Sequence, residues 1–355
     1  MPEAEPEAGD PTPEAAVEVM ADVPITDEKL AMEVLQSCGG HALRYAADSI
    51  RGNRAVVSSA VRSYGDALRY ASSDLRASKE LVLIAVQSNG LALEHVSTEA
   101  LKADREVVLM AVKQSAAALK YASPALLKDE SFVRMAVQAN GCALEYADIP
   151  FRDNIAIVQT AVKQCGHALQ FASPVLRADK ETVMAAVTQQ GTALSFASEE
   201  LRADHDLVLH ACKQNGGALQ FAAENLCSNE AIVKAAVRAG DAAAFQHAAA
   251  TLKADRRFML ELVGQQNGPC VRLAAAELKV DQQFLLEAVA LDGRVLQHCS
   301  AELLADRPFV EAAIRANGAA FEHLDPRLQD LALARAAVTS LAEALAKASP
   351  KNSGG

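Results

Sequence analysis

The sequence predicts an all-α solenoid: a superhelical array of about twelve 25-residue, two-helix repeats with a C-terminal capping helix. The first observation is a unit that recurs every 25 or 26 residues and begins at an Ala-Leu-type pair. The second is that helix-capping residues and apolar residues keep fixed places in the unit. Such a period is typical of stacked arrays in which each repeat contacts only its neighbours. The units begin at Ala42, Ala67, Ala92, Ala118, Ala143, Ala168, Ala193, Ala218, Ala244, Cys270, Val295 and Ala320.

The first half of the unit predicts a short helix, followed by a turn. In the second unit this helix covers Ala67–Ala71 and ends at Ser72, after which Leu75 returns to the core. Proline follows the equivalent serine at Pro124 and Pro174.

The second half of the unit predicts a longer helix with both ends marked. Its N-cap column contains only Asp, Asn or Ser, whose short side chains accept hydrogen bonds from the free N–H groups of a first turn. A glycine follows about eleven residues later, as at Gly65 and Gly90, and predicts a left-handed conformation that ends the helix. The N-cap residues are Asp27, Asn53, Ser78, Asp104, Asp129, Asn154, Asp179, Asp204, Asn229, Asp255, Asp281 and Asp306.

Equivalent positions of successive units form columns, and three of these columns are apolar in every unit. They are the columns that contain Leu43, Ile50 and Val82. A fourth column, which includes Ala60 and Ala85, is almost always alanine and predicts close approach of helices. Helices this short are not stable alone in water, so stacking must supply the stability. A leucine-rich repeat has a similar period, but the Ala-rich stretch before the glycine has helical spacing and no L-x-x-L-x-L strand.

The segments outside the array have a different composition. Residues 1–24 are acidic and Pro-rich, with seven acids and no Lys or Arg, and are expected to be disordered. The helical repeat array covers 25–326, and an Ala/Leu-rich capping helix covers 327–348. Residues 349–355 form a polar tail that is expected to be disordered.

Charge and targeting signals limit the function classes. Removing the seven N-terminal negative charges from the net charge of −11 leaves −4 for the remaining chain, which is close to balanced and argues against general nucleic-acid binding. The sequence has no secretory signal or transmembrane segment, so a cytoplasmic, reducing location is expected. The seven cysteines follow no metal-binding spacing and are expected to be reduced thiols.

The string ALxYASxxLRADKELVLxAVxQNGxALxYAS, as in Ala168–Ala197 and Ala193–Ala222, resembles a family of tandem helical repeats catalogued as domain of unknown function 4116. The resemblance covers roughly residues 27–326 and departs from the pattern at Arg238–His247 and Val263–Cys270, each of which carries an extra residue. It implies a helical-repeat fold, and it brings no activity and no catalytic residues.

Histidine occupies the fourth position of the unit in four repeats, at His95, His247, His298 and His323, where most others carry Tyr or Phe. A partly buried ring in an aromatic slot is the simplest interpretation. The alternative is a pH-sensitive stack of His298 and His323, because closely packed neutral imidazoles resist protonation.

A second group, His205, His210 and Cys212, superficially resembles a metal site. The two histidines are five residues apart, about 140° around a helix, so their rings cannot converge on one ion. Asp206 and His210 are expected to form a weak surface pair instead. The thiols of Cys212 and Cys299 are expected to be inert core groups, and Cys227 is the best candidate for a reactive thiol.

The most suggestive surface feature is a basic column just after the core leucine. In a stacked array its members lie along one edge, roughly 10 Å apart, each two residues before a helix N-cap where N–H groups favour anions. They either pair with nearby acids such as Asp74 or Glu200, or present an edge to an acidic partner. The column that contains Arg44 and Glu94 varies freely in charge and indicates either a solvated or a partner-binding face. The basic column is Arg51, Arg76, Lys102, Arg152, Arg177, Arg202, Lys253 and Lys279.

The sequence therefore predicts a non-enzymatic scaffold that presents an extended solenoid surface to a protein or peptide, and the basic edge favours an acidic partner. It offers no candidate catalytic, cofactor-binding or metal-binding residues. The alternatives are an RNA-binding helical repeat protein and a non-catalytic regulatory subunit of an enzyme complex.

Overall fold

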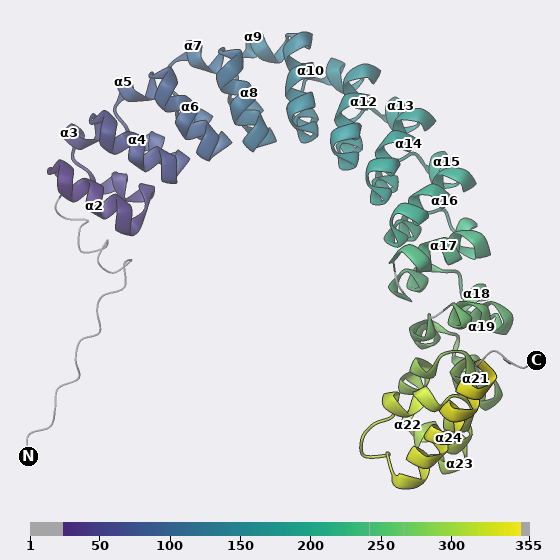
Figure 1. The fold of residues 1–355 in the computed structure, drawn as a ribbon. Helices are drawn as coiled ribbons and strands as arrows, with labels where there is room; N and C mark the ends of the chain where they lie inside the picture. Colours follow the sequence, from purple (N-terminus) through teal and green to yellow (C-terminus); the bar gives the residue numbers. More distant parts are fainter. Residues whose placement is uncertain (1–23, 241, 266, 349–355) are drawn as a thin grey trace, which may run out of the picture. The chain divides into compact units, whose positions relative to one another are not determined.

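The computed structural model describes residues 24–240, 242–265 and 267–348, and these form an all-α solenoid (Figure 1). Within this part of the chain the only β contact is an isolated bridge between Ile25 and Ala46. The predicted segments at residues 1–24 and 349–355 lie almost wholly outside the described residues. The chain also divides into two larger compact units, each of which contains several of the 25-residue repeats. The first unit ends at Gln189 and the second unit begins at Gln190.

Each repeat contains three helical segments rather than the two expected. In the second repeat these are a 3₁₀ helix, η3 (Gly65–Tyr70), a single α-helical turn, α5 (Ser73–Arg76), and a longer helix, α6 (Lys79–Ser88). The repeat begins at Ala67, so the first two residues of η3, Gly65 and Asp66, are the last two residues of the preceding repeat. Ala71 and Ser72 have extended backbones, with ψ angles of 155° and 157°, and separate the first two segments. The Ala-Leu pair therefore lies in a 3₁₀ helix, and the turn after it contains helix of its own.

The first unit repeats this order of segments. Its longer helices are α2 (Glu28–Cys38), α4 (Arg54–Ser63), α6, α8 (Arg105–Gln114), α10 (Glu130–Ala139), α12 (Ile155–Gln164) and α14 (Lys180–Gln189). Its short helices are α3 (Asp48–Arg51), α5, α7 (Glu99–Lys102), α9 (Pro124–Leu127), α11 (Ile149–Arg152) and α13 (Pro174–Arg177). Its 3₁₀ helices are η2 (Gly40–Tyr45), η3, η4 (Gly90–His95), η5 (Ala116–Tyr121), η6 (Gly141–Tyr146) and η7 (Gly166–Phe171).

The second unit continues the pattern and ends in a longer helix. Its longer helices are α16 (His205–Gln214), α17 (Glu230–Gly240), α19 (Arg256–Gly264), α21 (Gln282–Leu291), α23 (Arg307–Ala316) and α24 (Leu331–Ala348). Its short helices are α15 (Glu199–Arg202), α18 (Ala250–Ala254), α20 (Ala276–Val280) and α22 (Ala301–Ala305). Its 3₁₀ helices are η8 (Gly191–Phe196), η9 (Gly216–Phe221), η10 (Leu226–Ser228), η11 (Ala242–His247), η12 (Gly268–Leu273), η13 (Gly293–His298) and η14 (Gly318–His323).

The N-cap column behaves as predicted. Asp104 is typical, because its carboxylate accepts hydrogen bonds from the amides of Glu106 and Val107 at 3.0 and 3.2 Å. Ten of the twelve predicted caps accept such bonds, and only Ser78 and Asp306 make none. At these ten positions the polar residue therefore fixes where the longer helix begins.

The prediction that the repeated glycines end helices in a left-handed conformation is wrong. Among the described glycines only Gly39 has a positive φ, of 83°. A methyl group added to Gly65 or Gly90 would overlap the carbonyl oxygen of Ala85 or Ala111, which belongs to the next repeat. The glycine is required because two repeats approach closely, and the alanine column supplies the surface that it contacts.

The core consists of columns shared between neighbouring repeats. Val82, Ala85 and Leu68 are fully buried, as are nearly all their counterparts along the chain. A further buried column stands three residues after each N-cap from Asn53 onward and is apolar except at Thr182. The hydroxyl of Thr182 is buried without a hydrogen-bond partner.

Backbone hydrogen bonds also join consecutive repeats. The amide of Ser72 donates to the carbonyl of Arg51 at 3.0 Å, and the amide of Ser123 donates to that of Lys102 at 2.9 Å. The acceptor in each bond is the last residue of a short helix, and the donor precedes the next short helix. These bonds align the short helices, which follow the outer edge of the first unit while the longer helices lie on its inner side (Figure 1).

The helix α24 covers the end of the array, inside the range 327–348 expected for a cap. Leu333 and Ala337 are buried against the last repeat. A methyl group at Gly318 would overlap the carbonyl oxygen of Ala337, so this alanine takes the place that the alanine column holds in a further repeat. Among the described helices, none is both long enough and apolar enough to cross a membrane.

Candidate interaction surfaces

The basic column predicted from the sequence lies where the short helices end. Six members of the column are the last residues of their short helices: Arg51, Arg76, Lys102, Arg152, Arg177 and Arg202. The other two, Lys253 and Lys279, each lie one residue before the end of the helix. The carbonyls of six of them accept the backbone hydrogen bonds that join the repeats, namely those of Arg51, Arg76, Lys102, Arg152, Arg202 and Lys253. The side chains of the column are half-buried, except that of Lys279, which is exposed. The column therefore lies at the C-terminal ends of the short helices in each unit.

The charged ends of several of these side chains turn back onto their own repeat. Arg152 donates from Nη2 to the carbonyl of Glu145 at 2.6 Å and from Nε to that of Ala147 at 2.8 Å. Arg51 and Lys253 each donate to the carbonyl seven residues earlier, at 2.8 and 2.7 Å. They therefore satisfy carbonyls at the end of the preceding 3₁₀ helix, which lack partners within that helix.

The acids that pair with this column lie three residues earlier, at positions other than those expected. Arg51, Lys102 and Arg202 pair with Asp48, Glu99 and Glu199 at 3.6 to 3.8 Å. The Nε atoms of four arginines are buried without a protein hydrogen-bond partner, at Arg51, Arg76, Arg177 and Arg202. Some side chains of the basic edge are thus paired with acids, and others donate hydrogen bonds to carbonyls of their own repeat.

A second surface, which sequence reasoning missed, is the exposed side of the longer helices of the first unit. We call it the inner face and define it by the residues five and six positions after the N-caps of α4, α6, α8, α10, α12 and α14. They are Ser58, Ser59, Leu83, Ile84, Leu109, Met110, Arg134, Met135, Gln159, Thr160, Met184 and Ala185. These side chains change from repeat to repeat, whereas the core positions beside them stay constant.

The inner face carries an apolar patch on three consecutive helices. The patch consists of five half-buried or exposed side chains: Leu83 and Ile84 on α6, Leu109 and Met110 on α8, and Met135 on α10. The three helices pack side by side, so these positions are adjacent across the repeats. Large apolar side chains on the open side of an array are an informative signal, because nothing in the repeat itself requires them there.

Ion pairs between repeats border the inner face near the start of the longer helices. Lys79 contacts Asp104 at 2.7 Å and Glu106 at 2.8 Å, and these two acids raise the pKa of the Lys79 ammonium. Arg54 pairs with Glu80 and Arg105 with Asp129 in the same direction along the unit. The second unit has matching pairs, such as Arg256 with Asp281 at 2.7 Å.

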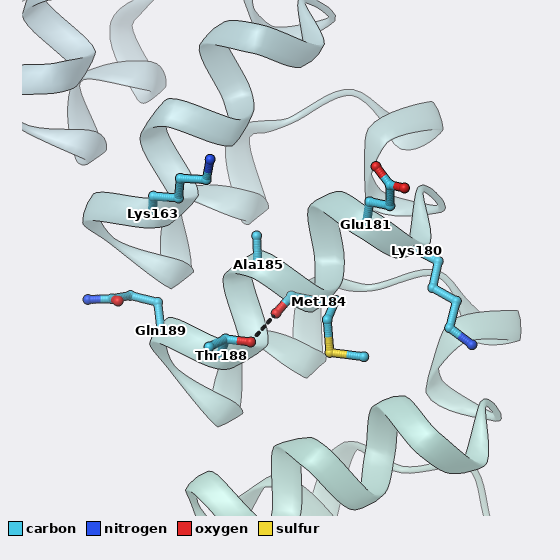
Figure 2. Close-up of a pocket in the computed structure, with 7 residues that line it drawn as sticks. All are labelled: Lys163, Lys180, Glu181, Met184, Ala185, Thr188 and Gln189. Carbon is cyan, nitrogen blue, oxygen red and sulfur yellow. Dashed lines mark hydrogen bonds between the residues drawn. The ribbon is translucent and has the colours of Figure 1, made fainter.

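The inner face is hollowed at the last helix of the first unit (Figure 2). The hollow has a volume of about 670 Å³ and is open to solvent. Figure 2 shows Met184 and Ala185 on α14, with Lys163 contributed by α12. The Thr188 hydroxyl donates to the Met184 carbonyl at 2.7 Å. Small-molecule sites usually enclose most of the ligand, whereas this hollow is open and lined by both apolar and amide groups. It therefore suits a side chain of a bound peptide better than a small molecule.

The histidine column occupies the aromatic slot as predicted. Burial lowers the pKa of His95, His247 and His298, and Arg272 and His323 add to the effect at His298. Three tyrosines of the same column, Tyr45, Tyr70 and Tyr146, have cations over their rings, for example Lys120 at 4.7 Å from the centre of the Tyr146 ring. This column therefore packs partly buried rings along the 3₁₀ helices.

The thiols of Cys212, Cys227 and Cys299 all have raised pKa values. Burial raises the pKa of Cys212 to about 12 and that of Cys299 to about 11, in line with inert groups. Burial and the charge of Glu224 also raise the pKa of Cys227, which lowers its thiolate fraction. The structure thus gives Cys227 no activation.

The cluster of His205, His210 and Cys212 includes a contact between neighbouring residues. The His205 Nδ1 atom lies 3.1 Å from the carboxylate of Asp206, the next residue. The expected pair of Asp206 with His210 stays a prediction. Across residues 24–240, 242–265 and 267–348, no three His, Cys, Asp or Glu side chains gather closely enough to hold a metal ion.

Comparison with known proteins gives a family but no function. No curated protein matches the chain. A family profile described as "Domain of unknown function (DUF4116)" matches residues 27–76, 53–102, 78–127, 104–152, 154–202, 204–242 and 281–329. Most of these segments span two of the 25-residue units, and the gap at residues 243–280 overlaps the repeats that carry extra residues. The matches cover well over half of the sequence, and the chain therefore belongs to the DUF4116 family.

Proposed function

We propose that this protein is a non-enzymatic scaffold that binds an apolar segment of a protein partner on its inner face. The observation that carries the proposal is the patch of Leu83, Ile84, Leu109, Met110 and Met135, which spans three repeats. A constant core beneath a variable face is the arrangement by which repeat proteins present long binding surfaces.

The composition of the patch suggests the kind of segment that it binds. Methionine side chains are flexible and polarisable, so Met110 and Met135 can adapt to different apolar groups. An amphipathic helix, whose apolar residues recur every three or four positions, can reach two or three neighbouring helices of the array. The amides and lysines of the same helices, such as Gln87 and Lys113, provide a polar border.

A photo-crosslinking experiment tests the proposal. A benzophenone amino acid replaces Gln87, which is exposed beside the patch, or Asp74, which is exposed on a short helix of the outer edge. We expect a specific protein adduct from the Gln87 position. An adduct formed only from the Asp74 position contradicts the proposal.

A matched pair of variants locates the binding surface. Ile84→Ser, Met110→Ser and Met135→Ser together remove the patch, whereas Ile149→Ser and Val175→Ser remove apolar side chains that are 80% and 72% exposed on the short helices. The inner-face variant is expected to lose the Gln87 adduct and the outer-edge variant to keep it. Loss of the adduct in the outer-edge variant alone would assign binding to the opposite edge.

The basic edge is the second candidate surface, and it favours an acidic protein partner. Lys or Arg stands there in eight repeats, although several of these side chains are engaged with their own carbonyls. Replacing Arg177 and Arg202 with Glu should abolish binding if this edge is used, and should leave it unchanged if the inner face is used. Filter binding at low salt tests the RNA-binding alternative.

A further inference from the structure

Two cysteines from different segments face one another across a repeat interface. Cys142 is the second residue of η6, and Cys165 directly follows α12 in the next repeat. Their sulfur atoms are 3.4 Å apart, and both side chains are partly buried. This contact uses none of the residues of the inner face or of the basic edge.

The backbone of the interface fixes this contact. A methyl group at Gly141 would lie 3.2 Å from the Cβ atom of Cys165 and 2.5 Å from the carbonyl oxygen of Ala161. The residue after the glycine is therefore held against the residue that ends the next long helix. Both sulfur atoms are positioned by this tight interface rather than by mobile segments.

The same two positions face one another in other repeats. Asn89 donates from Nδ2 to the Asp66 carboxylate at 2.9 Å, and His41 contacts the Tyr64 ring edge-on, with ring centres 6.4 Å apart. These pairs have the same separation of 23 residues along the chain as Cys142 and Cys165. The repeat geometry thus brings together whatever side chains occupy the two columns, and here both are thiols.

We propose that Cys142 and Cys165 form an oxidation site, at which hydrogen peroxide or a small disulfide converts the two thiols to a disulfide between repeats. With peroxide, both S–H bonds break, one S–S bond forms, and the peroxide takes two electrons and two protons to leave as two water molecules. With oxidised glutathione, two molecules of reduced glutathione leave instead. The sulfur atoms approach by about 1.4 Å to reach the usual bond length of about 2.05 Å.

The surroundings of the pair set the conditions for this reaction. Burial and the adjacent Cys165 thiol raise the pKa of Cys142 to about 11. Because the thiolate is the reactive form, Cys142 reacts slowly at neutral pH and faster as the pH rises. The bond would hold η6 to the end of α12, and so would oppose separation of two neighbouring repeats.

Peptide mapping of the full-length protein tests the site directly. The reduced protein is treated with hydrogen peroxide or oxidised glutathione at pH 8.5, alkylated and digested with trypsin without reduction. Cys142 falls in the peptide 135–152 and Cys165 in the peptide 164–177, and each contains one cysteine. We expect these two peptides to be recovered linked, two hydrogen masses below their sum. Full alkylation of both thiols, or links only between different molecules, overturns the proposal.

Variants and thermal melts provide an independent readout. Oxidised wild-type protein should melt at a higher temperature than reduced protein, and dithiothreitol should reverse the shift. C142S and C165S should each show no oxidation-dependent shift, and the buried Cys212 and Cys270 should remain alkylatable after denaturation. A shift of equal size in C142S would assign the effect to other cysteines and overturn the proposal.

Discussion

The Cα atom of Gly90 packs against the carbonyl oxygen of Ala111 in the next repeat, with no room for a side chain between them. A methyl group on Gly90 would overlap that oxygen and lie 3.0 Å from the Ser115 amide nitrogen. The carbonyl also accepts the last hydrogen bond of α8, from Ser115 at 2.9 Å. The lack of a side chain at Gly90 thus allows two repeats to pack closely at the carbonyl that accepts the last hydrogen bond of α8.

Gly90→Ala should destabilise the protein, because two backbones must separate to admit the methyl group. Overpacking of this kind costs about 1–3 kcal/mol, measured as the free energy of unfolding in urea. Gly52→Ala is the matched control, since its methyl group would meet ordinary contacts at 3.6 Å or more and its backbone is α-helical. Equal stability of the two variants would refute the close-approach explanation.

Leu219→Ala should lower the free energy of unfolding by about 2–5 kcal/mol, the usual effect of a large-to-small core substitution. Leu219 lies in η9 and is fully buried between repeats. Leu345→Ala, at a position of α24 that is 70% exposed, should change the stability little. Chemical denaturation of both variants makes the comparison, and a negligible effect at Leu219 would count against a shared core.

Thr182→Val should stabilise the protein by about 1 kcal/mol. The Thr182 hydroxyl is buried without a partner in a column that is otherwise apolar, and an unsatisfied buried polar group costs about 1–3 kcal/mol. Valine has nearly the same shape and leaves the helix cap at Asp179 intact. A raised melting temperature is the expected result, and a lowered one would show that the hydroxyl has a partner in solution.

Asp330 should make the stability of the C-terminal cap depend on pH in the acid range. Its carboxylate contacts Arg307 at 2.6 Å and accepts the Leu333 amide hydrogen bond at 2.9 Å, which hold its pKa to about 2. A lowered pKa stabilises the folded state above the ordinary value of about 4, and this stabilisation is lost as the pH falls from 4 to 2.

The variant Asp330→Asn isolates this effect, because asparagine can still cap the helix but carries no charge. The wild type should be more stable than the variant at pH 6, and the difference should shrink between pH 4 and pH 2. Hydrogen exchange in α24 measures it at the affected helix. A difference that stays constant from pH 6 to pH 2 would exclude a contribution from the Asp330 charge.

The sequence predicts the fold class because its repeated columns follow directly from the contacts between repeats. The caps at Asp104 and Asn154, the buried Leu68 column and the alanine column all have the roles assigned to them. The sequence shows equally clearly where the glycines recur, but it does not show why the repeat requires glycine there. A glycine after a helix most often marks a left-handed end, and only the structure shows that Ala85 of the next repeat excludes a side chain at Gly65.

The surfaces were harder to predict, because contacts across repeats depend on spacings that a single unit does not reveal. The basic column is conspicuous in sequence, yet Arg152 turns back onto Glu145 because of the 3₁₀ helix, which the periodicity did not predict. The inner-face patch can be found by counting five and six residues from each N-cap. The Cys142 and Cys165 pair can be found only when the 23-residue separation is known to join facing columns.

The central claim is that one 25-residue unit is the structural module of the chain and is stabilised by its neighbours. Deleting residues 79–104 joins Ser78 to Arg105, which leaves a serine at the N-cap position of α8 and brings Gly65 opposite Ala111. The matched variant lacks only residues 79–91, which is half a unit. Circular dichroism during thermal unfolding should show full helicity per residue and a cooperative transition for the whole-unit deletion, and loss of both for the shorter one. If the shorter deletion is tolerated as well as the longer one, the modular account is wrong.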